Sequence, residues 1–449
     1  MPFLTSTGSK TPNALAFEDL QGPLSYADLS EKVDEAARKL RALGAGPGKA
    51  IALPGVVSRE GLVGLHGIWK AGASAAPLNE RWTESEKAIG LEALSPFLIL
   101  EGPDLLSRLS EVPPSTGSLP PPDGRKEAVR LLTSGTSGRP GVVGLSYANL
   151  WASAEGSAAR LDLHPTDRWL ASLSPAHVGG IALITRTALT GACLVGRGPF
   201  SVSEFIRLLE TDSITHASLV PTMLRQTLAA WGGRPAPESL RCLLIGGAPA
   251  SDNLVDSATA LGFPIALTYG LTEAASQVAT APPALVRKKP GTVGLPLPGL
   301  EVRVAENQEL LVRGSMVALG RTDVDGWLRT GDLAREDGDG HLWIMGRLSD
   351  RIISGGVNVD PTEVERVLES HSEVTAAVVV GIPDPEWGER VVAAVTGTMG
   401  GSVPTAELDH LSRSNLSSAK RPRAFRVLDS IPRNTNGKVN REAVRALFQ

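Results

Sequence analysis

Short apolar runs alternate with stretches of helical periodicity along most of the chain. Apolar residues recur at helical spacing over 26–43 and 62–71, and a glycine that can end a helix follows each stretch. Apolar runs predict buried strands at 50–54, 73–77, 96–100, 129–132, 169–173, 193–195, 217–220, 242–245 and 264–267. This alternation is typical of an α/β fold with layered, mostly parallel sheets and helices between them.

The pattern changes near residue 300. Shorter apolar runs predict antiparallel strands at 302–304, 309–312 and 341–344. A new succession then predicts strands at 351–353, 375–380, 391–395 and 424–427 with helices at 361–370 and 405–416. Roughly 100 residues with their own alternation can form a compact α+β domain. We therefore place a domain boundary near 346–350, and a proline-rich surface linker at 113–124.

Composition narrows the class of protein. The 449 residues are 42% apolar and 20% charged with a net charge of −4, which fits a globular chain and argues against a disordered acidic protein or a nucleic-acid binder. No apolar run is long enough to span a membrane, and the first residues lack a secretory signal pattern, so we expect a cytoplasmic protein. The two cysteines sit in apolar runs and are expected to be buried free thiols.

Glycine is abundant, with 48 residues, and a glycine- and hydroxyl-rich segment follows the predicted strand 129–132. It reads Thr133-Ser-Gly-Thr-Ser-Gly-Arg-Pro140. Hydroxyls and loop N–H groups can donate to phosphate oxygens where glycine lets the backbone bend around them. The segment lacks the lysine of a Walker A loop, and taken alone it also fits a flexible polar loop.

A second segment, Thr268-Tyr-Gly-Leu-Thr-Glu273, follows an apolar strand. Its aromatic ring can stack on a base, its threonine can bind a phosphate, and its carboxylate can hold Mg²⁺. The alternative is a strand end followed by a helix that Thr272 caps.

Two further segments offer an isolated carboxylate and an isolated lysine. Asp332 ends Arg329-Thr-Gly-Asp332, where a carboxylate can accept both ribose hydroxyls, although it also fits a turn. Lys438 ends Pro432-Arg-Asn-Thr-Asn-Gly-Lys438 in a chain with only 11 Lys against 33 Arg. Such retention indicates a need for a compact ammonium, and the alternative is a solvated turn lysine.

In combination and in this order, the motifs resemble those of the adenylate-forming superfamily of acyl- and aryl-CoA synthetases, adenylating domains and luciferases. Further matching segments are 24–29, 70–73, 77–79, Gly246-Gly-Ala-Pro249, 325–327 and 361–365. Within the superfamily the chain is most similar to the o-succinylbenzoate–CoA ligases of menaquinone biosynthesis, on segments 174–180, 346–356 and 382–388.

The resemblance implies a large domain of layered sheets with a small β-barrel-like subdomain (1–346), a hinge (347–350) and a mobile C-terminal lid (351–449). It implies an acid–thiol ligase that uses ATP, Mg²⁺ and coenzyme A. A carboxylate forms an acyl-adenylate and pyrophosphate, and the CoA thiol then displaces AMP. The implied partners are these small molecules.

The resemblance also assigns roles to individual residues. The β/γ-phosphate loop would comprise Thr133, Ser134, Gly135, Thr136, Ser137, Gly138 and Arg139. The adenine slot would comprise Gly246, Gly247, Ala248, Tyr269 and Gly270, while Asp332 and Arg347 would hold the ribose. The reacting centre would use Thr272 on the α-phosphate, Glu273 on Mg²⁺, Lys438 between carboxylate and phosphate, and His177 as a gate beside the acyl pocket.

The resemblance places the hinge at Ser349, with Ser354, Gly355 and Gly356 lining the pantetheine channel after the lid rotates. His177 also fits a helix-start histidine. Arg186 and Arg225 are candidates for a second substrate carboxylate, but both also fit solvated surface positions.

Three positions depart from the family pattern. Gly141 stands where the phosphate loop usually ends in lysine, and Arg139 could substitute for it. Ser146-Tyr147 replaces a common Thr-His pair, and a shortened Gly320-Arg-Thr-Asp323 replaces the Gly-Tyr-Trp segment.

The open alternatives are another aryl- or medium-chain acyl-CoA synthetase, an enzyme that loads a carrier protein, and a non-catalytic nucleotide-binding homologue. A homodimer is expected only because twofold assemblies are common.

Overall fold

The computed structural model describes residue 4 and residues 11–100, 109, 111–119, 121–133, 140–397, 403–433 and 439–449. The chain forms two compact units. The first comprises Met1–Gly247, Ala258–Val302 and Val312–Leu328, and the second comprises Ala248–Ser257, Arg303–Leu311 and Arg329–Gln449. The domain borders expected from the sequence remain predictions.

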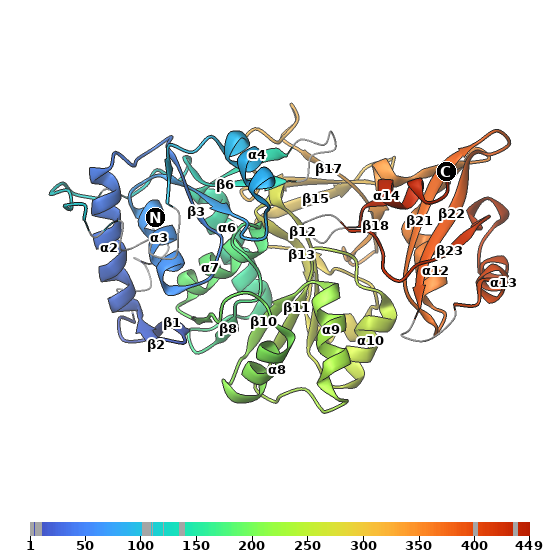
Figure 1. The fold of residues 1–449 in the computed structure, drawn as a ribbon, viewed down its shortest axis with the longest axis horizontal. Coiled ribbons are helices and arrows are strands. Elements are labelled where there is room, and N and C mark those ends of the chain that lie inside the picture. The colour runs from blue at the N-terminus through green and yellow to red at the C-terminus, as the bar shows by residue number, and fades with distance from the viewer. Residues whose placement is uncertain are drawn as a thin grey trace. The chain divides into compact units, whose positions relative to one another are not determined.

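The larger sheet of the first unit has nine strands in the order β14-β13-β12-β11-β10-β8-β9-β1-β2 (Figure 1). Its strands are β1 (Leu15–Asp19), β2 (Gly22–Ser25), β8 (Arg168–Leu170), β9 (Cys193–Val195), β10 (His216–Leu219), β11 (Cys242–Ile245), β12 (Ile265–Leu271), β13 (Ser276–Ala281) and β14 (Leu295–Pro296). The path from β12 to β1 is parallel, and β13, β14 and β2 add antiparallel edges. The predicted largely parallel α/β architecture is confirmed.

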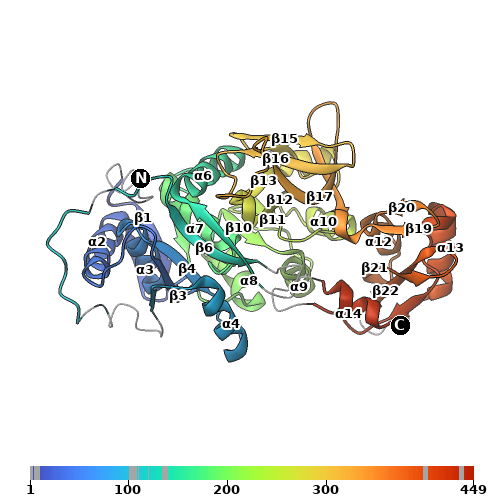
Figure 2. The same ribbon diagram turned by 90° about the horizontal axis from the view of Figure 1, so that it is seen from above.

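The second sheet has the order β5-β3-β4-β6-β7, of which only β7 is antiparallel to its neighbour. Its strands are β3 (Ala50–Pro54), β4 (Ser74–Leu78), β5 (Leu98–Ile99), β6 (Glu127–Thr133) and β7 (Gly141–Ser146). Figure 1 shows α6 (Tyr147–Leu161) and α7 (Val178–Thr190) between strands of the two sheets, and Figure 2 shows the same elements from above. α6 contacts strands of both sheets, which makes this helix pair the centre of the unit.

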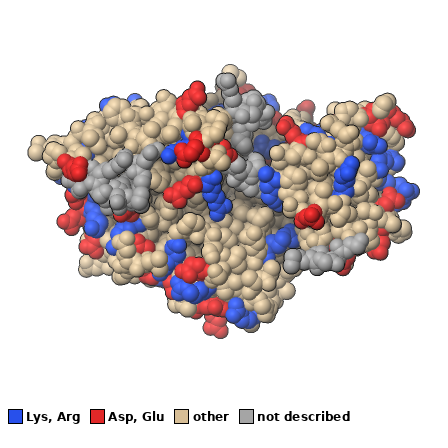
Figure 3. Space-filling model, in the orientation of Figure 1, with Lys and Arg blue, Asp and Glu red and all other residues tan. Residues whose placement is uncertain are grey.

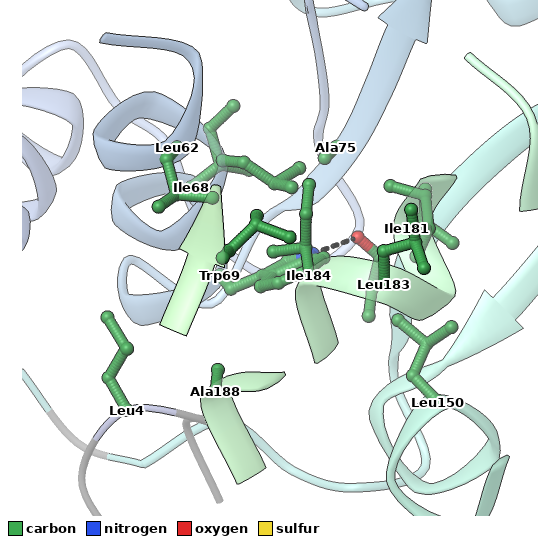
Figure 4. Packing of buried hydrophobic residues seen from close by; sticks show 14 of the residues in the cluster. Leu4, Leu62, Ile68, Trp69, Ala75, Leu150, Ile181, Leu183, Ile184 and Ala188 are labelled. Carbon is green, nitrogen blue, oxygen red and sulfur yellow. Dashed lines mark hydrogen bonds between the residues drawn. The ribbon is translucent and has the colours of Figure 1, made fainter. Parts of the chain in front are cut away.

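Other helices cover the sheets. α2 (Tyr26–Ala42) starts with a capping box in which Ser25 and Asp28 exchange bonds, and it buries a stripe at helical spacing. It packs on α3 (Arg59–Lys70), whose Trp69 donates its indole N–H to the Ala128 carbonyl at 2.9 Å (Figure 4). Further described helices are α4 (Glu84–Leu94), α8 (Val202–Thr211), α9 (Pro221–Trp231), α10 (Asp252–Ala260) and α11 (Pro283–Lys288), of which α10 lies mostly in the second unit.

A four-stranded sheet corresponds to the predicted barrel-like part, with the order β15-β16-β17-β18. Its strands are β15 (Leu300–Val304), β16 (Glu309–Gly314), β17 (Leu328–Glu336) and β18 (Leu342–Arg347). The last sheet has the order β20-β19-β22-β21, with β23 beside β22. Its elements are β19 (Ile352–Ser354), β20 (Val357–Val359), α12 (Pro361–Glu369), β21 (Val374–Asp384), β22 (Gly388–Gly397), α13 (Thr405–Asn415), β23 (Phe425–Val427) and α14 (Arg441–Ala446).

Residue alternation explains how this last sheet builds a core on both faces. Val379 and Val391 pack in a cluster with α12 and α13, whereas their neighbours Val378 and Val392 pack in a second cluster with Val444 of α14. Both faces of the sheet are therefore covered, which accounts for the nearly continuous apolar residues of β21 and β22.

Cys193 and Cys242 are free and buried, as predicted. Burial raises the pKa of Cys193 to about 11 and that of Cys242 to about 12. Within the described residues, no helix combines the length and the apolar character that a membrane crossing requires.

Candidate active site

The end of β12 carries the second motif found in the sequence. The strand begins buried and ends at Leu271, and a 3-10 turn follows over Thr272–Ala274. The pairing with β13 is irregular between Tyr269 and Gly270, where an added Cβ would collide with the main chain of Ser276. The strand-end interpretation is confirmed, but Thr272 as a helix cap is wrong, since Leu271 occupies the cap position and makes no side-chain bond.

Hydrogen bonds to two main-chain carbonyls hold the turn that carries Glu273. The Ala318 N–H donates to the Glu273 carbonyl at 2.7 Å, and the Ser153 hydroxyl donates to the Ala275 carbonyl at 2.5 Å. Ala275 and Ser276 adopt positive φ angles of 52° and 100°, a region that non-glycine residues occupy only when the surroundings impose it. The Thr272 and Glu273 side chains are partly buried, and they project from a turn whose backbone is held in place.

Gly246 and Gly247 follow β11, which runs parallel to β12, so both motifs lie at the same edge of the sheet. A Cβ on Gly246 would come within 2.6 Å of Thr268 Cγ2, and Gly247 has a φ of +79°. Glycine is required here by close packing at one position and by backbone conformation at the next. Ala248 is exposed and belongs to the second unit.

The two ends of the predicted phosphate loop are also placed. Thr133, the last residue of β6, pairs with Gly141, the first residue of β7. A Cβ at Gly141 would lie 2.9 Å from the Thr133 hydroxyl oxygen. Ser134, Gly135, Thr136, Ser137, Gly138 and Arg139 lie outside the described residues.

In the second unit, Asp332 on β17 faces Arg347 on β18. The Arg347 Nε atom lies 2.7 Å from Asp332 Oδ1, and the carboxylate side chain is only 8% exposed. The Thr330 hydroxyl accepts from the Asp332 N–H at 3.1 Å, and Glu309 accepts from the Gly331 N–H at 3.1 Å. The predicted ribose pair is therefore brought together on neighbouring strands.

Ser349 lies in a 3-10 turn, Leu348–Asp350. The next residue, Asp350, pairs with Arg441 at 3.0 Å, and Arg441 also reaches Glu365 at 2.7 Å. Burial alone would lower the pKa of Arg441, but these two carboxylates raise it. Arg441 belongs to none of the motifs recognised in the sequence, and its position three residues after Lys438 is the only local signal that points to it. Lys438 itself lies outside the described residues.

Gly355 and Gly356 form the two-residue turn of the β19–β20 hairpin. Both have positive φ angles, +58° and +76°, as a primed hairpin turn requires. The Gly355 N–H donates to the Trp387 carbonyl at 2.8 Å, and a Cβ on Gly355 would lie 3.1 Å from the indole ring. Ser354 is buried, whereas the two glycines are exposed.

His177 is exposed and occupies the N-cap position of α7, although its side chain makes no capping hydrogen bond. It therefore stands at the start of a helix, as the alternative interpretation predicted. The surface interpretation of Arg186 is wrong. Arg186 is 2% exposed, donates from Nε to the Ala182 carbonyl and lies over the Trp169 ring at 4.9 Å. Burial lowers the pKa of Arg186 to about 10. Arg225 is exposed.

Asp337, Asp339 and His341 bring three potential metal-binding atoms within 4.8 Å of one another. Asp337 Oδ1 accepts from the N–H groups of Asp339 and His341, so this carboxylate already shapes the β17–β18 turn. On the face drawn in Figure 3, basic and acidic side chains are interspersed, in keeping with the small net charge.

Two family profiles match the chain: "AMP-binding enzyme" over residues 4–320 and "AMP-binding enzyme C-terminal domain" over residues 363–438. The chain belongs to the AMP-binding enzyme family. Among its curated relatives are the 2-succinylbenzoate–CoA ligases of Bacillus cereus and Bacillus cytotoxicus, at 32% and 33% identity. These alignments cover 98% of this chain and 96% and 97% of the relatives.

Solved structures agree over nearly the whole chain. The o-succinylbenzoate CoA synthetase MenE of Bacillus subtilis, in complex with the acyl-adenylate intermediate OSB-AMP, is 29% identical with a TM-score of 0.89, covering 99% of this chain and 98% of its own. ATP-bound MatB of Rhodopseudomonas palustris is 25% identical with a TM-score of 0.90, covering 100% and 98%.

Proposed function

We propose that the chain is an AMP-forming ligase that joins o-succinylbenzoate to coenzyme A, as in menaquinone biosynthesis. The carboxylate displaces pyrophosphate from the α-phosphorus of ATP, and the CoA thiol then displaces AMP from the acyl carbon. The observation that carries the proposal is the near-full-length likeness to ligases named for this acid. Fold alone does not choose the acid, because MatB and MenE superimpose equally well.

ATP and Mg²⁺ are the proposed cofactors, as in the MenE complex with ATP and magnesium ion. The donor set fits them: Glu273 offers a partly buried carboxylate on a fixed turn, and the glycines after β11 leave the backbone accessible to a flat base. Thr272 would bind the α-phosphate and Tyr269 would stack on adenine. Mg²⁺ supplies neutralisation of phosphate charge when it is bound.

The Asp332–Arg347 pair supports the ribose assignment, because the arginine orients a nearly buried carboxylate, a group that can accept hydrogen bonds from ribose hydroxyls. We also propose that Ser349 is the hinge, that Ser354, Gly355 and Gly356 line the pantetheine channel, and that Lys438 acts in adenylation. His177 would gate the acyl pocket. A two-domain arrangement suits two successive reactions at one site.

Pyrophosphate release from ATP tests the proposal. We expect release with o-succinylbenzoate, and an acyl-CoA product only when CoA is added. Faster release with benzoate or octanoate would favour another acyl-CoA synthetase, and thioester formation on a carrier protein but not on CoA would favour a carrier-loading enzyme. No release with any acid would favour the non-catalytic homologue. The homodimer and the cytoplasmic location remain predictions.

A further inference from the structure

A buried polar network crosses the core below the end of β12. The Gln277 side chain on β13 donates from Nε2 to the Thr280 hydroxyl at 2.7 Å and to the Thr268 hydroxyl at 3.3 Å. Its Oε1 atom accepts from the Ser157 hydroxyl of α6. Gln277 is 2% exposed, and Thr280 and Ser157 are fully buried. The amide therefore ties a central helix to two strands of the larger sheet.

The threonine hydroxyls fix which way the amide points. Thr268 donates to the Ala279 carbonyl at 2.9 Å, and its hydroxyl oxygen also lies 2.9 Å from that of Thr280. Because the Thr268 proton is used on the carbonyl, Thr280 donates to Thr268, and both hydroxyls are left to accept from the amide nitrogen. A satisfied buried network of this kind favours a single arrangement of the elements that it joins.

An extra residue in β13 aims Gln277 into this network. The pairing with β12 shifts by one residue between Tyr269 and Gly270, and Val278 is the residue left over, which makes a β-bulge. Residues three apart face opposite sides of a regular strand, whereas the bulge lets Gln277 and Thr280 share one side. The bulge therefore places the amide in the core.

The network reaches the segment that ends in Glu273 from both strands. Thr268 is the first residue of that segment. Gln277 lies opposite Gly270, where an added Cβ would come within 2.9 Å of the Gln277 Cα atom. With so little space between the strands, a displacement of Gln277 would also displace the strand end.

The helix α6 holds the same segment at a second point. Ser157 bonds to Gln277, and one turn earlier Ser153 donates to the Ala275 carbonyl at 2.5 Å. The residues proposed to bind the α-phosphate and Mg²⁺ lie between Thr268 and Ala275. Both ends of this stretch are therefore fixed to one helix.

We propose that Gln277 is a positioning residue for acyl-adenylate formation. Because its side chain is buried, it acts through Thr268 and α6, and it fixes the direction in which Thr272 and Glu273 leave the strand. The inference rests on the proposed function, which assigns those two residues to the α-phosphate and to Mg²⁺. A leucine would fill similar space, but it would lack the directed bonds that hold the strand against the helix.

Pyrophosphate release by the full chain provides the test, with o-succinylbenzoate or with whichever of benzoate and octanoate the wild-type protein accepts. We expect Gln277→Leu to lower kcat about tenfold to hundredfold, because small misplacements of reacting groups are costly. The KM for ATP should change by a smaller factor, since the ribose pair of the second unit is untouched.

A second variant separates the network from the glutamine alone. Ser157→Ala should lower kcat in the same direction but less, and the double variant should match Gln277→Leu, since both substitutions break one network. Alanine suits a helix, so Ser157→Ala keeps the proposal testable even where Gln277→Leu does not fold.

Tyr26→Phe is the matched control in the same unit, because Tyr26 is buried and its hydroxyl donates to the Thr187 and Ala192 carbonyls at 2.8 and 2.9 Å. It should lower the midpoint of urea unfolding and leave kcat unchanged. An unchanged kcat in the network variants, an equal fall in Tyr26→Phe, or additive effects in the double variant would overturn the positioning role alone. No release by the wild-type protein with any acid would instead refute the proposed function, and this inference with it.

Discussion

The two units place their candidate site residues by different means. In the first unit, close main-chain packing positions these residues. Gly246 and Gly270 lie where a side chain would collide with neighbouring atoms, and a main-chain hydrogen bond holds the turn that carries Glu273. In the second unit, ion pairs position these residues: Asp332 is paired with Arg347, and Asp350 is paired with Arg441.

The difference bears on how each part can act. Main-chain packing is insensitive to salt and cannot be rearranged without unfolding the local structure. A partly exposed ion pair such as Asp350–Arg441 is screened by salt, and it can break and re-form at a smaller cost than a buried pair. The candidate residues of the first unit are therefore fixed by the backbone, whereas those of the second unit depend partly on contacts that salt weakens.

The largest expected effect tests whether a charge of the second unit serves only one half-reaction. Lys438→Ala should slow acyl-adenylate formation by about 10²–10⁴, because a cation at the reacting phosphate stabilises the transition state. Thioester formation from supplied acyl-adenylate should be spared. Lys420→Ala is the control, since Lys420 is the other lysine after residue 289 and pairs with Glu363. Equal losses in both half-reactions would refute this role.

A smaller effect is expected at the ribose pair. Asp332→Ala should raise the KM for ATP roughly tenfold to hundredfold with a smaller change in kcat, because it removes bonds to a charged group. Steady-state kinetics at varied ATP concentration measure this. Asp409→Ala removes a partly exposed aspartate paired with Arg413 and should leave the KM unchanged. An unaltered ATP dependence in Asp332→Ala would exclude the ribose contact.

The smallest effect probes the backbone packing of the first unit. Gly270→Ala should lower the free energy of unfolding by about 1–3 kcal/mol, because the new methyl group meets the Ser276 main chain. Urea unfolding measures this change. Gly117→Ala is the control, since nothing lies within 4 Å of a Cβ there. Equal stability of the two variants would show that the β12 end is not tightly packed.

The amino-acid sequence predicted the strands whose apolar residues are contiguous, such as β3 and β11. It missed β17, because the polar residues of Leu328–Glu336 hide a strand whose alternate positions are buried. It also missed the contact of Arg321 with Val142, since 179 residues separate the two and no local pattern records such a distance. Arg186 was misplaced because charge normally indicates exposure, and here an aromatic ring and a helix carbonyl accommodate it.

The burial of the two cysteines has a chemical consequence. A mixed anhydride such as an acyl-adenylate reacts with any thiolate that reaches it, and self-acylation would inactivate a ligase that made one. Cys193 and Cys242 are the only cysteines of the chain, and their high pKa values keep both protonated near neutral pH. The thiols of the protein itself therefore do not compete with the CoA thiol for the proposed acyl-adenylate.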